Sequence, residues 1–242
     1  MVTNLAYFYE TSRSVRGGKW VWVKDGNGEQ RGNVLLGGTI LNPKKGFDHL
    51  YAAQLVEYKP AVGCLIFRSF ALKEAAAASA TEYVLNGDGY GDAPEVGMVV
   101  MVAPDALTVK SATADTTTGE VTETETEYTG QSAKITNVVY DKANEKFTIT
   151  LDNTLGELEA GAILVEATGT AKSASAKVLV KNPNTFIEAD RDLLPTDGFG
   201  IENANYSIST VYNKQAWIAR MQPLPKYVLA NNKSLIEGIF WI

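Results

Sequence analysis

A glycine-rich loop at residues 86–92 contains the residue types of a calcium-binding loop. Asn86, Asp88 and Asp92 provide side-chain oxygens at ligand-like spacing. However, Tyr90 occupies the middle ligand position, and Gly97 stands where a bidentate glutamate belongs. The loop also lacks the Gly-Lys-Ser/Thr ending of a phosphate-binding loop and does not match Gly-x-Gly-x-x-Gly. We interpret it as a turn whose glycines adopt positive φ angles, with a cation site as the alternative, and we expect no metal or other cofactor.

The other side chains that could act in catalysis or metal binding lack the partner residues that such a site requires. His49 is the only histidine, so the sequence supplies neither a Ser-His-Asp relay nor the set of ligands that zinc needs. Cys64 is the only cysteine and lies in an apolar run, which indicates a buried side chain and excludes an intrachain disulfide. The carboxylates between Asp115 and Glu127 occupy one polar tract rather than a pocket. We therefore predict that the chain is not an enzyme.

Composition narrows the possible partners. The chain has 242 residues, a formal net charge of −6 and a hydrophobic content of 45%. The acidic balance argues against nucleic acid, which would require a basic face. The chain begins without the pattern of a secretory signal, and no apolar run approaches the roughly 20 residues of a membrane span. We expect a soluble protein, made in a cytoplasm, that binds neither nucleic acid nor membrane.

The elements that must hold any functional surface are predicted to be mainly β. Short β-branched runs lie at 96–103, 135–140, 147–151 and 162–165, with turn residues between them. We expect 141–145 to be a hairpin loop. In the strand at 135–140, alternation places Ile135 and Val139 on one face, with Val138 and Tyr140 on the other. The pattern indicates a small β-barrel or sandwich module.

Short helices are expected in the N-terminal part, which makes the predicted class α+β. From Phe47 to Tyr58, apolar residues recur at three- and four-residue spacing, which predicts a helix that ends at Pro60. The alanine-rich segment Leu72–Ser79 predicts a second, two-turn helix. By contrast, 121–128 alternates Thr with Glu and has no apolar face, so the tract at 111–129 is predicted to be an exposed hairpin or a disordered loop.

Part of the central sequence resembles a known group of proteins. The runs that carry the resemblance are Pro94–Met101, Ile135–Tyr140, Phe147–Leu151 and Leu158–Val165, which lie within a span of about a third of the chain. They resemble decoration, auxiliary capsid and head-fibre proteins of tailed phages that infect gut Bacteroidetes, including crAss-like phages. The resemblance implies a small β-barrel that binds a capsid lattice and brings no catalytic residues with it. The implied partners are the major capsid protein, copies of the chain itself and a head fibre, and the implied location is the virion.

We predict three regions: an N-terminal α+β, capsid-facing region (1–92), a β module with an exposed Thr/Glu-rich hairpin (93–181), and a C-terminal β segment with a docking tail (182–242). In the last region, 206–212 and 215–221 are predicted strands joined at 213–214. The chain ends in a strongly apolar run that must dock within the fold or on another subunit.

Both ends of the chain are predicted to form protein interfaces. The candidate residues are Tyr7, Phe8, Tyr9, Arg13, Arg16, Leu235, Ile236, Ile239, Phe240, Trp241 and Ile242. The alternative function is a carbohydrate-binding or adhesive module, in which exposed Trp20, Trp22 and Tyr90 act as stacking platforms. Buried rings at these positions would remove that alternative.

Overall fold

The structure is a computed structural model of the chain. It describes residues 15–16, 19–20, 34–36, 40–44, 48–59, 62–87, 92–114, 121–170, 172–187, 191–193, 209–211, 216–217, 221–231 and 239–240. Of the predicted interface residues, Arg16, Ile239 and Phe240 lie in described strands. The others, and the rings of Trp22 and Tyr90, lie outside the described residues.

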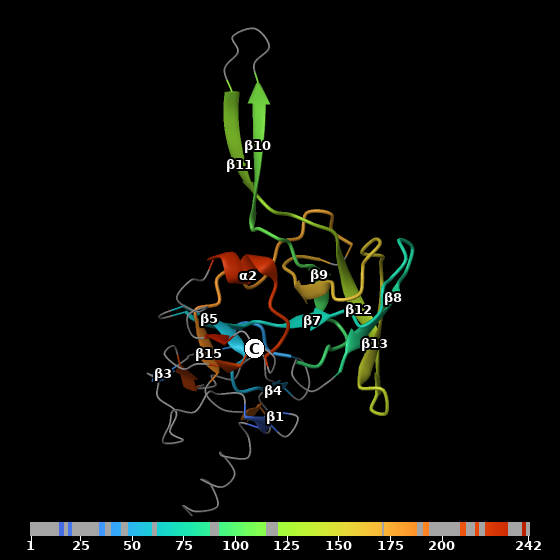
Figure 1. The fold of residues 1–242 in the computed structure, drawn as a ribbon, viewed down its shortest axis with the longest axis vertical. Helices are drawn as coiled ribbons and strands as arrows, with labels where there is room; N and C mark the ends of the chain where they lie inside the picture. The colour runs from blue at the N-terminus through green and yellow to red at the C-terminus, as the bar shows by residue number, and fades with distance from the viewer. Residues whose placement is uncertain are drawn as a thin grey trace, which may run out of the picture.

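Two antiparallel sheets build the body of the protein (Figure 1). The larger sheet has the order β7-β14-β9-β12-β13-β8. Its strands are β7 (Ser69–Ala71), β8 (Glu82–Asn86), β9 (Val99–Val102), β12 (Ser132–Asp141), β13 (Lys146–Leu151) and β14 (Ile163–Glu166). The smaller sheet has the order β3-β17-β15-β5-β6, formed by β3 (Val34–Leu36), β5 (Leu55–Lys59), β6 (Gly63–Ile66), β15 (Thr185–Ile187) and β17 (Ser209–Val211).

Four further strand pairs and a helix complete the described structure. The antiparallel pairs are β1 (Val15–Arg16) with β2 (Lys19–Trp20), β4 (Asp48–Leu50) with β16 (Arg191–Leu193), and β10 (Thr108–Ala114) with β11 (Val121–Glu127). β18 (Ala216–Trp217) pairs in parallel with β19 (Ile239–Phe240), and α2 spans Lys226–Asn231. The β10–β11 hairpin, called the arm below, projects from the body at one end of the molecule (Figure 1).

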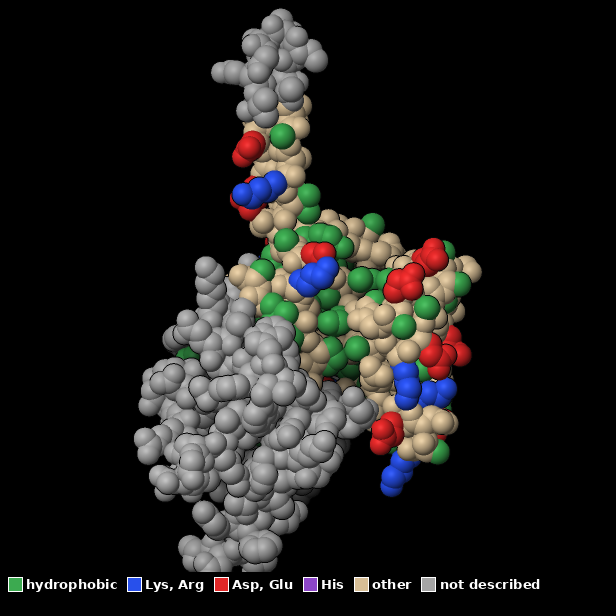
Figure 2. All heavy atoms as spheres, viewed as in Figure 1, with side chains coloured by type: hydrophobic (Ala, Val, Ile, Leu, Met, Phe, Trp, Pro, Cys, Tyr) green, Lys and Arg blue, Asp and Glu red, His purple; other side chains and the backbone are tan. Residues whose placement is uncertain are grey.

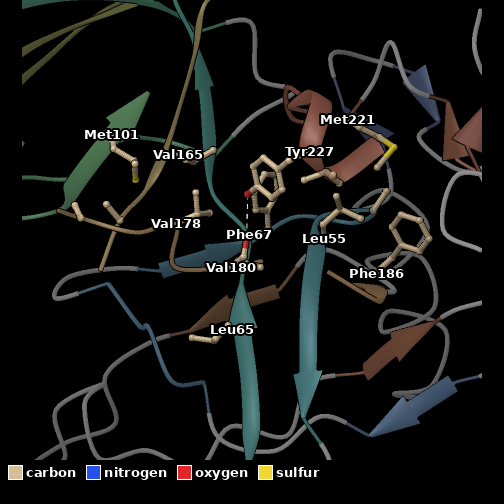
Figure 3. Close-up of a cluster of buried hydrophobic side chains, with 14 of the residues drawn as sticks. Leu55, Leu65, Phe67, Met101, Val165, Val178, Val180, Phe186, Met221 and Tyr227 are labelled. Carbon is tan, nitrogen blue, oxygen red and sulfur yellow. Dashed lines mark hydrogen bonds between the residues drawn. The ribbon is translucent and has the colours of Figure 1, made fainter. Parts of the chain in front are cut away.

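The hydrophobic core is divided by the two sheets. A central cluster combines Leu55 and Leu65 of the smaller sheet with Met101 and Val165 of the larger one. Their sequence neighbours point the other way: Val100 and Leu164 enter a second cluster, and Val56 and Ile66 a third. Because adjacent residues of a strand face opposite sides, strands buried on both faces read as continuous apolar runs. α2 packs on the central cluster through Tyr227 and Val228 (Figure 3).

The mainly-β prediction is confirmed, but the larger sheet is not a closed barrel. Its first and last strands approach where Leu72 forms a bridge with Leu85, which curls the sheet. The predicted runs at 96–103, 135–140, 147–151 and 162–165 contain or overlap β9, β12, β13 and β14, and the hairpin loop at 141–145 is present. The tract at 111–129 is an exposed hairpin rather than a disordered loop over its described residues.

The predicted facing of β12 is wrong. A register shift between Ile135 and Asn137 adds one residue to this strand relative to β13. Such a bulge reverses the alternation beyond it. Ile135 is therefore buried, whereas Val139 is 53% exposed. Val138, rather than Val139, packs against the same cluster as Ile135.

Both predicted helices are also wrong. Residues 48–59 form β4, a tight turn and β5; Ala53 has a φ of 62°, and Gln54 N–H donates to Tyr51 O at 3.0 Å. Segment 72–79 is not helical either, because its backbone pairs with strands: Ala76 bridges Leu158, and Lys73 N–H donates to Val84 O. Packing between layers overrides a helix propensity that is marginal at this length.

In the C-terminal third, the predicted strands exist but do not pair with each other. β17 joins the smaller sheet and β18 pairs with β19. Sequence analysis also missed α2, although Pro225 immediately before it is a recognised signal of a helix start. The three-region division stays a prediction. The sheets cross its boundaries, since β7 and β8 join the larger sheet and β15 and β17 join the smaller one.

Candidate functional site: a projecting arm on an ion-paired base

The arm is the most exposed element among the described residues. β10 and β11 pair over seven positions, from Thr108 opposite Glu127 to Ala114 opposite Val121. The described strands add no third member to this sheet. Figures 1 and 2 show the arm extending clear of the body, with acidic and basic side chains along its length. Both outer strand edges are therefore accessible to a binding partner.

The register of the hairpin gives the arm two different faces. Residues directly opposite in an antiparallel pair share a face. One face contains Thr108, Lys110, Ala112 and Ala114 of β10 with Val121, Glu123, Glu125 and Glu127 of β11. The other face, formed by Val109, Ser111, Thr113, Thr122, Thr124 and Thr126, carries no charge. The segment 121–128 is predicted to have no apolar face. The register adds that one face of the arm is acidic and the other is rich in hydroxyl groups.

The open edge of β11 presents the backbone groups of two of its glutamates. Tyr128 N–H donates to Leu107 O at 2.7 Å, which identifies this pair as hydrogen-bonded. Hydrogen-bonded positions alternate along an antiparallel ladder, so Thr126, Thr124 and Thr122 direct their backbone groups toward β10. Glu123 and Glu125 consequently direct theirs to the outer edge. The same two residues offer carboxylates on the acidic face.

The base of the arm is fixed to the body by ion pairs. The Glu127 carboxylate accepts hydrogen bonds from Lys177 and Lys181, and these two bonds lower the pKa of Glu127. Next to it, Leu107 and Tyr128 pack against the central cluster. Lys226 of α2 pairs with Asp105 at 2.9 Å. These contacts hold the arm at its root while the rest of the hairpin stays in solvent.

A second notable group is a buried ionic cluster made by Lys44, Arg68, Asp92 and Glu166. Arg68 lies between β6 and β7 and is 1% exposed. Its Nε donates to Asp92 Oδ2 at 3.0 Å, and its Nη1 donates to Glu166 Oε2 at 3.2 Å. Lys44 donates to the other oxygen of Asp92. Through Asp92, the cluster joins the end of the 86–92 loop to the region between β6 and β7 and to β14.

The contacts within this cluster favour a structural role over the binding of a ligand. Arg68 Nη1 also donates to Asn42 O at 2.6 Å, and Asn42 Nδ2 donates to Glu166 Oε2 at 2.9 Å. Asp92, considered above as a calcium ligand, already accepts from Lys44 and Arg68. Buried charges are retained when paired in this way, because an unpaired charge in the interior is costly.

Glu166 gives the cluster a pH dependence. Burial raises the pKa of Glu166 above its ordinary value of 4.5, with Arg68 and Asn42 opposing the shift. A folded-state pKa above the unfolded one means that folding takes up a proton between the two values. The stability contributed by Glu166 is therefore present at acidic pH and falls as pH rises through that window.

The variant Glu166→Gln tests this dependence. Both donors, Asn42 Nδ2 and Arg68 Nη1, reach Oε2, so an amide oxygen can accept both bonds. We expect the wild-type free energy of unfolding to fall relative to that of E166Q as pH rises from below 4.5 to neutrality. Urea titrations of both proteins at several pH values measure this difference. A constant difference across the range would contradict the assigned shift.

Of the predicted interface residues, the structure describes only Arg16, Ile239 and Phe240. Arg16 lies in β1, opposite Lys19 of β2, and Ile239 and Phe240 lie in β19 beside β18. Sequence reasoning overlooked Arg68, Lys177 and Lys181. An arginine between the apolar runs of β6 and β7 is a recognisable signal of a buried charge, whereas the pairing of Lys177 and Lys181 with Glu127 has no local signal.

Comparison of the chain with protein-family models, with curated proteins and with solved structures found no match. Among the described residues, no three His, Cys, Asp or Glu side chains are grouped to hold a metal ion. No helix in the described part of the chain is long and apolar enough to cross a membrane. Any assignment of function therefore depends on the arm, the cluster and the sequence.

Proposed function

We propose that this protein is a non-enzymatic structural component of a tailed-phage head, which binds the capsid and stabilises or decorates it. The observation that carries the proposal is the arm: two seven-residue strands that leave the body, bury no core of their own and expose both edges. In the described chain the arm makes contact with the body only at its root.

A two-stranded hairpin without a packed face is at best marginally stable in water. An exposed strand edge is also a template for pairing with another chain, as in strand addition to a sheet edge. A partner that covers the arm would remove both liabilities. In a head protein the natural partners are the major capsid protein, neighbouring copies and a head fibre.

The resemblance to phage-head proteins supports the same proposal. Its four sequence runs overlap β9, β12, β13 and β14, four neighbouring strands of the larger sheet. The arm is the connection between β9 and β12. The sheet that carries the resemblance is therefore the platform from which the arm projects (Figure 1).

Removal of the arm tests the proposed function. Replacing residues 110–125 with Asn-Gly would close the ribbon at the hydrogen-bonded pair Val109–Thr126, which suits a two-residue turn. Glu127 and its two lysines are kept. We expect an unchanged melting temperature of the body and a loss of incorporation into particles on the order of tenfold or more. Quantitative mass spectrometry of purified particles measures incorporation, and wild-type incorporation of this folded variant would refute the proposal.

The apolar C-terminal tail gives a second prediction. Deletion of Leu235–Ile242 removes β19, and with it the partner of β18. Burial of large apolar side chains contributes about 1.5–3 kcal/mol each, so deletion of this apolar run should abolish incorporation. The control is Lys142→Ser, a substitution of an exposed residue in the β12–β13 loop. Normal incorporation of the truncated chain would show that the tail is not an attachment element.

A further inference from the structure

The excess negative charge of the protein is concentrated in the arm. Residues 108–127 contain five acidic side chains and one basic one, a net charge of −4, in a chain whose formal net charge is −6. Glu127 is matched by Lys177 and Lys181. Glu125 accepts only a hydroxyl, from Thr108 at 2.7 Å, among the contacts of the described residues. Glu123 and Glu125 are thus available to a cation at the open edge of β11.

The complementary charge lies near the N-terminus of the same chain. Residues 13–24 contain Arg13, Arg16, Lys19 and Lys24 and no acidic residue. The register of β1 and β2 sets Arg16 directly opposite Lys19. This N-terminal strand pair therefore belongs to a basic segment, opposite in charge to the arm.

The two complementary elements cannot meet within one copy of the body. Figure 1 shows β1 at the end of the molecule opposite the arm. Pairing of one arm with the arm of another copy is also disfavoured. With both β11 edges side by side, rows of glutamates would face each other, and like-charge juxtaposition across an interface is costly.

We infer that the open β11 edge of one copy docks on the β1–β2 hairpin of a second copy. The carboxylates of Glu123 and Glu125 face Arg16 and Lys19 of the second copy, and the outward backbone groups of β11 pair with it. The contact joins two different surfaces, so repetition generates rings or extended arrays rather than closed twofold dimers. This inference rests on the proposed function, in which copies of the chain assemble on a head.

Self-association of the purified full-length chain tests the contact. We expect concentration-dependent association at low salt that weakens as added salt screens the charges. The double variant Glu123→Lys/Glu125→Lys should weaken it by about tenfold or more. The control Glu157→Lys/Glu159→Lys makes the same change of net charge on exposed body residues and should associate like wild type. Sedimentation velocity measures each species, with circular dichroism as the check of folding.

Reversing the charges on each of the two surfaces tests whether these surfaces contact each other. Arg16→Glu/Lys19→Glu should also weaken association, whereas an equimolar mixture of this variant with E123K/E125K should restore it. Glu123→Pro, which removes an outward N–H, should bind more weakly than Glu123→Thr, which keeps it. A monomeric wild-type chain, no rescue in the mixture, or equal binding of the E123P and E123T variants would overturn the inference.

The two proposals fail in different experiments. If E123K/E125K destroys self-association but the arm-deletion variant enters particles normally, the proposed function fails and the contact stands. If the wild-type chain is monomeric but arm deletion prevents incorporation, the arm binds another head component and the inferred contact fails.

Discussion

Arg68→Met is expected to be among the most destabilising single substitutions in the body, with a loss of about 3–5 kcal/mol in the free energy of unfolding. Methionine fills much of the volume but removes the charge that faces Asp92 and Glu166. Lys44 still pairs with Asp92, but Glu166 loses its pairing with Arg68. Because breaking a buried pair leaves an uncompensated charge, the loss exceeds the net contribution of the pair itself. Chemical denaturation monitored by tryptophan fluorescence measures it.

The double variant Arg68→Met/Glu166→Gln is the matched control. It removes one positive and one negative charge together and keeps the pairing of Lys44 with Asp92. We expect it to be more stable than Arg68→Met alone, which gives a favourable coupling energy in a double-mutant cycle. Arg68→Lys should be intermediate, because an ammonium keeps the charge but cannot donate to Asp92, Glu166 and Asn42 in the fork geometry of arginine. Equal stability of R68M and R68M/E166Q would contradict this account.

Tyr227→Ala is expected to cost about 3–5 kcal/mol, the usual range for truncation of a buried aromatic residue. Tyr227 is fully buried and fixes α2 on the central cluster among residues of both sheets. Figure 3 shows its ring beside Phe67 and its hydroxyl directed at Val180, whose carbonyl accepts a hydrogen bond at 2.9 Å. Burial raises the pKa of Tyr227 above its ordinary value, so the hydroxyl stays a donor. A urea titration measures the loss.

Tyr227→Phe separates packing from hydrogen bonding. It keeps the ring and leaves the Val180 carbonyl without its donor, so we expect a smaller loss of about 1–3 kcal/mol. Lys226→Ala is a neighbouring surface control, because its pairing with Asp105 is exposed and such pairs contribute about 0–1 kcal/mol. If Y227A were no less stable than Y227F, the helix would not depend on ring packing.

The stability of the body bears directly on the function of the arm. Leu107 and Tyr128, at the root of the arm, pack on the same central cluster as Tyr227. The pairing of Glu127 with Lys177 and Lys181 fixes the root end of β11. A rigid root limits the directions in which the acidic edge can point. Binding through the arm therefore loses less conformational entropy than binding through a flexible loop.

Several features of the fold and the candidate site follow from local sequence. The Thr/Glu alternation of 121–128 predicts a polar segment outside the core, either a hairpin or a disordered loop, since neither face can join a core. The β-branched runs identify β9, β12, β13 and β14, because each run is short and is bounded by turn residues. Even α2 has a local signal in Pro225, although the nearby prolines obscured it.

The errors of prediction occur where long-range contacts determine local structure. Leu55 and Val56 are adjacent yet enter different clusters, so a strand buried on both faces gave an apparent helical spacing. Segment 72–79 has high helix propensity but is extended because its backbone pairs with Val84 and Leu158. At β12, one bulge reverses the facing of Val138 and Val139. Each outcome depends on a partner that is distant in sequence.

The sequence by itself therefore determined that this protein is mainly β and that it carries an acidic tract without an apolar core of its own, because alternation and charge are properties of neighbouring residues. Only the tertiary structure decided that this tract stands out as an arm with its glutamates on an open edge. It also decided that Lys44, Arg68, Asp92 and Glu166 meet in one buried cluster. The physical reason is that register and burial are set by contacts between segments, which no local pattern encodes.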